Sequence, residues 1–393
     1  MISVEQAIQI ISNNVDATSV SREINISVAL DYVLFDDVIS PINMPPFRQS
    51  AMDGYALHLH DTKEYAIVGE VKAGDHHQPH LKIGEAIRIF TGAPVPDSAN
   101  AVIMQEKTNV VEDSLRIQTE INTNSNIRQL GEQVMKGEIA LKMGTKLNPA
   151  SIAFLATLGI TKVKVYKKPA ISIVVTGNEL AEPDSSLQYG QIYESNAVML
   201  STSLKQLGYN EVTMHKVNDD YGNTLSLLDR VISENDVVLV SGGISVGDYD
   251  FVGKALNELD VKELFYKVKQ KPGKPLFFGK KESKIIFALP GNPAAALSCF
   301  YLYVLLALEL LSGNVIFSLH RTQALSNSDY IKRGDRGQFL KAIYDNGKVE
   351  ILDGQSSSML HTFALSNALV YLSETAESIT KNDQVEVILL PIN

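Results

Sequence analysis

The stretch VVLVSGGISVGDYDF, residues 237–251, shows most clearly how this chain folds. It begins as an apolar strand, breaks at the small residues Gly242 and Gly243, and ends with the carboxylates Asp248 and Asp250. Glycine-rich loops after buried strands usually receive anions, because backbone amides can approach a phosphate where no Cβ intervenes. Two carboxylates would repel such an anion unless a cation lay between them.

Apolar strands alternate with helical patterns on both sides of this stretch. We predict strands at 171–175, 211–217, 236–240 and 284–289, and helices at 196–207, 221–233 and 250–259. This alternation is typical of a parallel sheet covered by helices on both faces. The sequence therefore predicts an α/β domain over residues 169–312.

The N-terminal part has a different pattern. Residues 46–136 contain short alternating runs separated by Gly, Pro, Asn and Asp, which indicates a β-rich domain. The flanking segments, 1–45 and 137–168, each carry a helix signal, with Ser3 and Asn148 as N-caps. We therefore expect the β-rich domain to be inserted into a discontinuous N-terminal domain.

The C-terminal residues 313–393 return to short strands, with a hairpin turn at Asn346-Gly347. Upstream of them, the apolar run 294–308 is shorter than the ~20 residues that span a bilayer, so we expect a buried core helix and no membrane association. The only cysteine, Cys299, lies in this run, and we expect a buried, unreactive thiol.

The composition favours a soluble protein of a reducing compartment. A single cysteine cannot form an internal disulfide, and the N-terminus MISVEQAIQII lacks the basic start of a secretory signal, so we expect a cytoplasmic location. The net charge of −10 argues against a general nucleic-acid-binding protein. Anionic small ligands remain compatible with it, because local basic loops can override the overall sign.

In a sheet of this kind, ligands bind beyond the carboxyl ends of the strands. The four strands are followed by the loops 176–179, 218–220, 241–245 and 290–293, which together offer glycines, hydroxyls and carboxylates. A single Gly-Gly turn would most simply be a tight turn. Several such loops at one edge favour a binding site for a phosphorylated ligand.

Three carboxylates come from three of these loops or from the segment just beyond. Glu179, Asp219 and Asp250 could share one Mg²⁺, an ion that commonly bridges carboxylates and phosphate oxygens. The alternative is that Asp219 and Asp250 are N-caps of the helices that follow them. Both roles remain open from the sequence.

The tract YKVKQKPGKPLFFG adds positive charge, and its Pro-Gly turn separates Lys271 from Lys274. Lysine runs usually form solvated surfaces, but the prolines favour a fixed presentation. In the β-rich part, Asp53-Gly54 is most simply a turn, and Thr91 lies in the proline-stiffened loop RIFTGAPVP. The histidines of DHHQPH lack partners at ligand spacing, which favours an exposed turn over a metal site.

Several motifs, taken together, resemble one family. They are PPFRQSAMDGYA (45–56), RIFTGAPVP (88–96), NIRQLGE (126–132), TGNEL (176–180), SGGISVGDYDF (241–251), KPGKP (271–275) and LPGNPAAAL (289–297). They occur in the order seen in molybdopterin molybdenumtransferases, the family that includes the C-terminal domain of gephyrin. The resemblance extends over nearly the whole chain and is more specific than any single glycine-rich loop.

The resemblance implies a fold, an activity and an assembly. It implies a discontinuous domain, a β-rich insertion, a molybdopterin-binding α/β domain and a C-terminal β-barrel. Such proteins form homodimers whose cleft combines the α/β domain of one subunit with the insertion of the other. They take adenylylated molybdopterin, cleave its bond to AMP with Mg²⁺, and insert molybdate. A molybdopterin adenylyltransferase is a possible partner.

The resemblance also implies residue roles. Gly242, Gly243 and Ser245 would hold the pterin phosphate, and Glu179, Asp219 and Asp250 would serve the metal or the phosphoanhydride. The pterin and oxyanion pocket would be lined by Lys271, Lys274, Pro290, Asn292 and Pro293. Asp53 and Thr91 would come from the second subunit, and Arg336 and Ser357 resemble molybdate-pocket positions.

The chain departs from the family pattern at Gln133, where an aspartate is common. An amide is a weaker ligand for a hard cation than a carboxylate, so we expect a slower or specialised enzyme if this position serves the metal or a proton transfer. Two alternatives remain. A molybdopterin adenylyltransferase would need only the α/β domain, and a scaffold protein of the same fold would tolerate loss of Asp250 or Lys274.

Overall fold

The computed structural model describes residues 1–244 and 251–392. The chain forms two compact units, of which the first comprises Met1–Arg22, Asp31–Val33 and Tyr166–Asn393, and the second Glu23–Leu30 and Leu34–Val165. Helix α1 (Val4–Asn14) thus belongs to the same unit as the α/β domain, although we expected it in the discontinuous domain. The boundaries of the four domains otherwise stay a prediction.

A six-stranded sheet forms the centre of the first unit. Its order is β16 (Val212–Val217), β13 (Ile171–Thr176), β17 (Val237–Ser241), β21 (Lys284–Leu289), β20 (Phe277–Lys281) and β18 (Lys262–Tyr266). The first four are the predicted strands and run parallel to one another, whereas β20 runs antiparallel to both of its neighbours, β21 and β18. The expectation of a parallel sheet is therefore confirmed for the four predicted strands. The edge formed by β20 and β18, which the sequence did not predict, is antiparallel because hairpins need no crossover helix.

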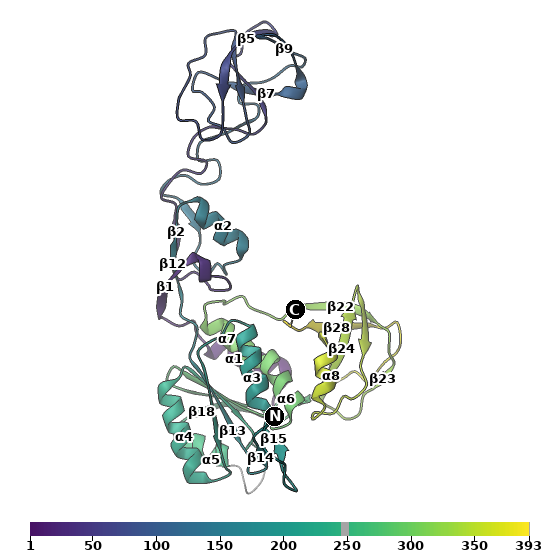
Figure 1. Ribbon diagram of the computed structural model, residues 1–393. Coiled ribbons are helices and arrows are strands. Elements are labelled where there is room, and N and C mark those ends of the chain that lie inside the picture. The colour runs from purple at the N-terminus through teal and green to yellow at the C-terminus, as the bar shows by residue number, and fades with distance from the viewer. Residues whose placement is uncertain (245–250, 393) are drawn as a thin grey trace. The chain divides into compact units, whose positions relative to one another are not determined.

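Helices cover both faces of this sheet (Figure 1). One face packs against α1, α3 (Asn196–Gln206) and the helix that begins at α6 (Pro293–Cys299), and the other against α4 (Tyr221–Glu234) and α5 (Phe251–Glu258). Successive strand residues alternate between the two cores: Ile173 and Leu239 join the first, Val174 and Val240 the second. Each such side chain contributes about 1.5–3 kcal/mol when fully buried.

The helix that begins at α6 continues without a break through η3 (Phe300–Val304) and α7 (Leu305–Leu311). Its 19 residues are apolar and long enough to cross a membrane, yet the whole segment is buried inside the protein. Burial in the core therefore accounts for its hydropathy, as the sequence predicted.

A closed five-stranded barrel follows in the same unit, as predicted. Its strands are β24 (Gly337–Asp345), β25 (Lys348–Ile351), β22 (Arg321–Ser326), β28 (Gln384–Leu389) and β26 (Ala368–Leu372), and β26 pairs back with β24. Asn346 and Gly347 form the predicted hairpin turn, both with positive φ. Beside the barrel lie β23 (Tyr330–Ile331), β27 (Ser378–Ile379) and α8 (Leu360–Leu365).

The second unit is β-rich, as predicted. Its main sheet has the order β7 (Ala101–Met104), β4 (Gly54–Leu57), β6 (Glu85–Ile89), β5 (Glu64–Val71), β9 (Ser114–Ile117) and β8 (Thr108–Val111). Its helix α2 (Pro149–Thr157) begins with the predicted cap, since Asn148 accepts from the Ser151 N–H. Short strands complete the fold: β2 (Val38–Ile39), β3 (Gln49–Ser50), β10 (Ile127–Arg128), β11 (Ile139–Leu141) and β12 (Lys162–Tyr166), with β1 (Ser21–Asn25).

Candidate functional site

A cavity of about 790 Å³ lies beyond the carboxyl ends of the four parallel strands, where the sequence predicted a binding site. All the post-strand loops contribute to it. Its lining includes Thr176, Gly177, Glu179, Asn196, Asp219, Ser241, Gly242, Gly243, Lys267, Lys274, Pro290, Gly291, Asn292, Pro293 and Ser358. Most of the predicted site residues of the first unit therefore meet in one place.

The turn at Gly242 and Gly243 requires glycine. Both residues have positive φ, at 95° and 62°. A Cβ on Gly242 would lie 2.7 Å from the Thr176 carbonyl oxygen, and one on Gly243 would lie 2.6 Å from Val252 Cγ2. A side chain at either position would therefore displace its neighbours, which explains why this turn needs glycine.

Asn196 ties two of the cavity loops together. Its side-chain amide donates to Ser241 Oγ at 2.8 Å and to the Gly291 carbonyl at 2.7 Å. Because a carbonyl can only accept, these bonds fix the orientation of the amide. The remaining atom, Asn196 Oδ1, is buried and has no hydrogen-bond partner among the residues that the structure describes. Sequence analysis missed Asn196; its one signal was a position at the start of a predicted helix.

Two of the three predicted metal-binding carboxylates, Glu179 and Asp219, line the cavity. Asp219 is held by Asn178, which accepts from its N–H at 3.0 Å and whose own N–H donates to Asp219 Oδ2 at 3.4 Å. The helix N-cap is Asp220, which accepts from the Asn223 N–H, so the alternative role of Asp219 as a cap was wrong. Asp250 and Ser245 lie outside the described residues.

The lysine tract turns back on itself beside the cavity. The Lys267 N–H donates to the Leu276 carbonyl at 3.1 Å, and the Val268 N–H donates to the Lys274 carbonyl at 3.0 Å. This hairpin places Lys274 in the cavity lining together with Lys267, which we had not predicted. Lys271 lies in β19 (Gln270–Lys271), which pairs with barrel strand β24, and does not line the cavity.

Hydrogen bonds to Gln270 hold the tip of this hairpin in place. Gln270 is fully buried and accepts from the Tyr303 hydroxyl, while its amide donates to the Gly273 carbonyl at 3.1 Å. Arg336, predicted as a molybdate contact, donates to the Gln270 carbonyl at 3.1 Å. The helix core and the barrel thus hold the segment that presents Lys274.

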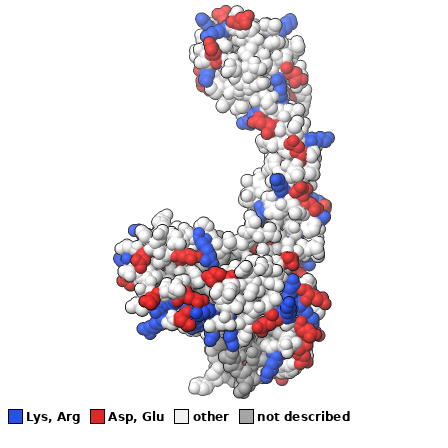
Figure 2. Space-filling model, turned by 180° about the vertical axis from the view of Figure 1, so that it is seen from behind, with Lys and Arg blue, Asp and Glu red and all other residues white. Residues whose placement is uncertain are grey.

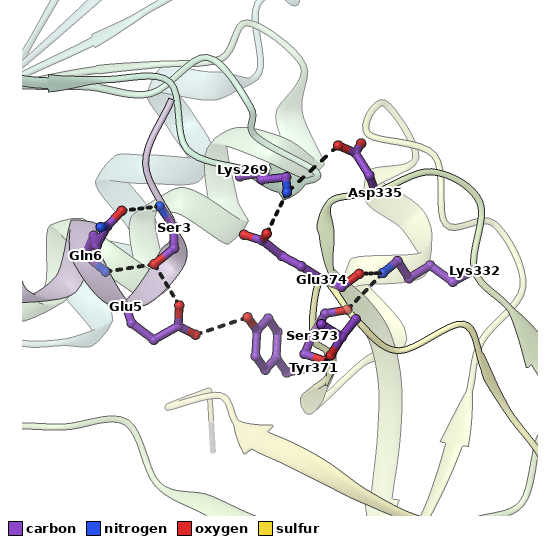
Figure 3. A network of polar contacts seen from close by, with 10 residues as sticks. Ser3, Glu5, Gln6, Lys269, Lys332, Asp335, Tyr371, Ser373 and Glu374 are labelled. Atoms are coloured by element: carbon purple, nitrogen blue, oxygen red, sulfur yellow. Dashed lines mark hydrogen bonds and ion pairs between the residues drawn. The ribbon is translucent and has the colours of Figure 1, made fainter.

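A polar network adds further contacts between this segment and the barrel (Figure 3). Lys269 Nζ lies 2.7 Å from Glu374 and 3.9 Å from Asp335, and the hydrogen bond to Glu374 raises the pKa of Lys269. The Tyr371 hydroxyl donates to Glu5 of α1 at 3.2 Å. Figure 2 shows positive and negative side chains interspersed over one face of the molecule.

The loop before α6 joins the barrel at the other end of the cavity. Asn292 Nδ2 donates to Ser357 Oγ at 2.9 Å, and the Ala295 N–H donates to the Ser357 carbonyl at 3.2 Å. Ser358 reaches the cavity lining. The predicted residues Asn292 and Ser357 are therefore in direct contact.

The remaining predicted residues, Asp53 and Thr91, lie in the second unit and contact each other. Asp53 Oδ1 accepts from both the N–H and the hydroxyl of Thr91, each at 2.7 Å. These bonds, the backbone one first, lower the pKa of Asp53. Asp53 is therefore an exposed carboxylate held by Thr91 of the loop 88–96.

Two other groups are accounted for. Burial raises the pKa of the Cys299 thiol to about 12, which agrees with the predicted unreactive role. In the described part of the chain, no group of three or more His, Cys, Asp or Glu side chains is placed to hold a metal ion, and this includes His76, His77 and His80.

Three family models match the chain. The MoeA N-terminal region (domains I and II) matches residues 2–159, a probable molybdopterin-binding domain matches 172–310, and the MoeA C-terminal region (domain IV) matches 323–390. The matches thus include both regions outside the α/β domain.

Full-length relatives and solved structures agree with these matches. A molybdopterin molybdenumtransferase of Haemophilus influenzae is 33% identical over 98% of both chains. One from Staphylococcus epidermidis is 31% identical over 100% of this chain and 96% of its own. The crystal structure of a molybdopterin biosynthesis moeA protein from Pyrococcus horikoshii, 28% identical, superposes with a TM-score of 0.85 and covers 99% of this chain and all of that one.

Proposed function

The chain belongs to the molybdopterin molybdenumtransferase family, an enzyme family of molybdenum cofactor biosynthesis, and we propose that it inserts molybdate into adenylylated molybdopterin with release of AMP. The reaction breaks a phosphoanhydride, which chiefly requires positioning and neutralisation of charge. It needs no nucleophilic thiol, and the only cysteine is buried.

The observation that supports this proposal is the convergence of glycine turns, lysines and carboxylates on one cavity. Gly242 and Gly243 offer backbone amides, Lys274 offers a cation, and Glu179 and Asp219 offer anionic oxygens. A tight turn alone would explain the glycines, and a solvated surface alone would explain the lysines. Neither explains why they meet in a cavity large enough for a drug-sized ligand, about 300–1,000 Å³.

Each part of the cavity has a role in this proposal. The amides of Gly242 and Gly243 hold the pterin phosphate, and Lys274 neutralises charge on the phosphoanhydride. The loop Pro290–Pro293 forms one wall. Ser357 lies at the end of the cavity where molybdate binds. Arg336 donates to the Gln270 carbonyl and thus supports the hairpin that presents Lys274 there.

Magnesium fits the donor set at this edge of the sheet. Glu179 and Asp219 both line the cavity and offer the oxygen ligands that a hard cation prefers. The remaining ligands would be substrate oxygens, water and Asp250. When bound, the ion would neutralise negative charge on the phosphate oxygens.

We propose a cytoplasmic homodimer in which Asp53 and Thr91 of a second subunit complete the site. What supports this is the pair of hydrogen bonds from Thr91, which hold the exposed Asp53 carboxylate in one orientation. A molybdopterin adenylyltransferase would supply the substrate and is the partner that this chemistry requires.

The deciding experiment uses the purified protein with adenylylated molybdopterin, molybdate and Mg²⁺. AMP release together with formation of active cofactor supports the proposal. Consumption of ATP and free molybdopterin would indicate the adenylyltransferase instead. Absence of both activities in a folded protein, with no loss of partner binding in an Lys274→Ala variant, would indicate a scaffold.

A further inference from the structure

Lys341 is a buried cation that the proposed reaction does not use. It lies on barrel strand β24 and is only 3% exposed. Lysine is almost never this deeply buried unless its charge is paired. Within residues 1–244 and 251–392, no carboxylate forms an ion pair with Lys341. Burial lowers the pKa of its ammonium group.

The ammonium group instead binds three carbonyls of one loop, residues 352–360, which we call the serine loop. Lys341 Nζ donates to the carbonyls of Gly354 at 2.8 Å, Met359 at 3.0 Å and Ser356 at 3.1 Å. These bonds use all three ammonium hydrogens. The buried charge is thus satisfied entirely by the backbone of the serine loop.

The backbone of Lys341 holds the same loop a second time. Its N–H donates to Gln355 Oε1 at 2.9 Å, and its carbonyl accepts from Gln355 Nε2 at 2.9 Å. Gln355 Nε2 also donates to the Leu352 carbonyl at 2.7 Å. Lys341 therefore holds the serine loop through both its side chain and its backbone.

The serine loop borders the cavity through Ser358. Ser358 lines the cavity, and Ser357 joins the loop to Asn292 and Ala295 through hydrogen bonds of 2.9 and 3.2 Å. Hydroxyl groups are suitable donors to a tetrahedral oxyanion. The carbonyls of Gly354, Ser356 and Met359 point toward Lys341, so they do not repel an anion bound at the loop. The positive charge of Lys341 attracts such an anion.

We propose that Lys341 is a positioning residue for the oxyanion end of the cavity, which holds Ser357 and Ser358 where a tetrahedral dianion of the molybdate class binds. The proposal rests on the proposed function. It assigns the selectivity for the oxyanion to a residue that never touches it.

The test separates the two substrates. Lys341→Met removes the charge and three donors and retains the length of the side chain. We expect the KM for molybdate to rise about 10-fold or more, while the KM for adenylylated molybdopterin changes less than about twofold, because only the oxyanion end is disturbed. Lys348→Met, at an exposed lysine of the same barrel, is the matched control and should change neither.

A second variant and a double-mutant cycle distinguish a loss of positioning from a folding defect. Gln355→Leu releases the loop without placing an apolar group at the buried charge and should give the same split of KM values. Ser357→Ala combined with Lys341→Met should weaken molybdate no more than the stronger single variant, because both act through one loop. Equal changes for both substrates, a change in kcat alone, or only a lower melting temperature would overturn the proposal.

Direct binding distinguishes this proposal from the proposed function. Titration of the full-length protein with sodium molybdate should show weaker binding to Lys341→Met than to wild type, whether or not AMP is released. If wild type releases AMP but Lys341→Met binds molybdate equally well, Lys341 has no positioning role. If molybdate binding depends on Lys341 while AMP is never released, the transferase reaction fails and the oxyanion site stands.

Discussion

Replacing Asn196 by leucine, which has nearly the same shape, should reduce activity far more than stability. The substitution removes the two donors that tie Ser241 to Gly291, at 2.8 and 2.7 Å. It leaves the Gly291 carbonyl without this donor, which costs about 1–3 kcal/mol. It also removes the buried, unpartnered Asn196 Oδ1, which relieves a penalty of similar size. The two changes nearly cancel, and the net effect on the free energy of unfolding should lie within about 2 kcal/mol.

The effect on catalysis does not cancel. Without the Asn196 amide, only weaker contacts join the loops, such as that of the Gly242 N–H with the Leu289 carbonyl at 3.3 Å. A displacement of about 1 Å at the glycine turn can reduce the rate about 100-fold. We therefore expect kcat/KM for AMP release to fall by about that factor, while the melting temperature changes by less than about 8 °C.

The assay measures AMP release by the purified variant alongside thermal unfolding by circular dichroism. Thr202→Val is the matched control, since Thr202 is exposed and lies on the same helix, where its hydroxyl bonds only to carbonyls of the preceding turn. Unchanged kcat/KM in Asn196→Leu would refute the view that this amide aligns the two loops. A melting temperature lowered by more than about 15 °C would show instead that Asn196 is a structural residue.

The remaining predictions concern the glycine turn, the second unit and the buried thiol. Gly243→Ala should abolish AMP release, because the new Cβ would lie 2.6 Å from Val252 Cγ2. Gly334→Ala is the control, since Gly334 also has a positive φ but a Cβ there would have no atom within 4 Å. This control should lower only the free energy of unfolding, by about 1–2 kcal/mol. An equal mixture of Asp53→Asn and Lys274→Ala subunits, unfolded and refolded together, should regain about a quarter of wild-type AMP release if two subunits share each site, and none if they do not. Cys299 should resist iodoacetamide in the native protein at pH 8.5 and react after unfolding, because its folded pKa of about 12 keeps the thiol protonated; rapid labelling of native protein would contradict this. By the same shift, the neutral thiol stabilises the fold below the ordinary thiol pKa, and this contribution is lost as the pH rises towards 12.

Local sequence patterns were enough to predict several elements of this fold. The strands predicted at 171–175 and 284–289, the N-caps Ser3 and Asn148, and the Asn346-Gly347 turn follow from periodicity and from the conformations that these residues favour. The convergence of the loops on one cavity also followed, because the carboxyl ends of parallel strands share one edge of the sheet.

Tertiary contacts, which the sequence does not show, set which side chains line that cavity. Lys267 enters its lining and Lys271 does not, because the hairpin at 267–276 and the pairing of β19 with β24 set the direction of each. Asn196 bonds to partners 45 and 95 positions away, and Lys341 bonds to backbone carbonyls that any sequence could supply. Every residue has a backbone carbonyl, so the sequence does not indicate which carbonyls will accept these hydrogen bonds. Contacts of this kind are visible only in the folded structure.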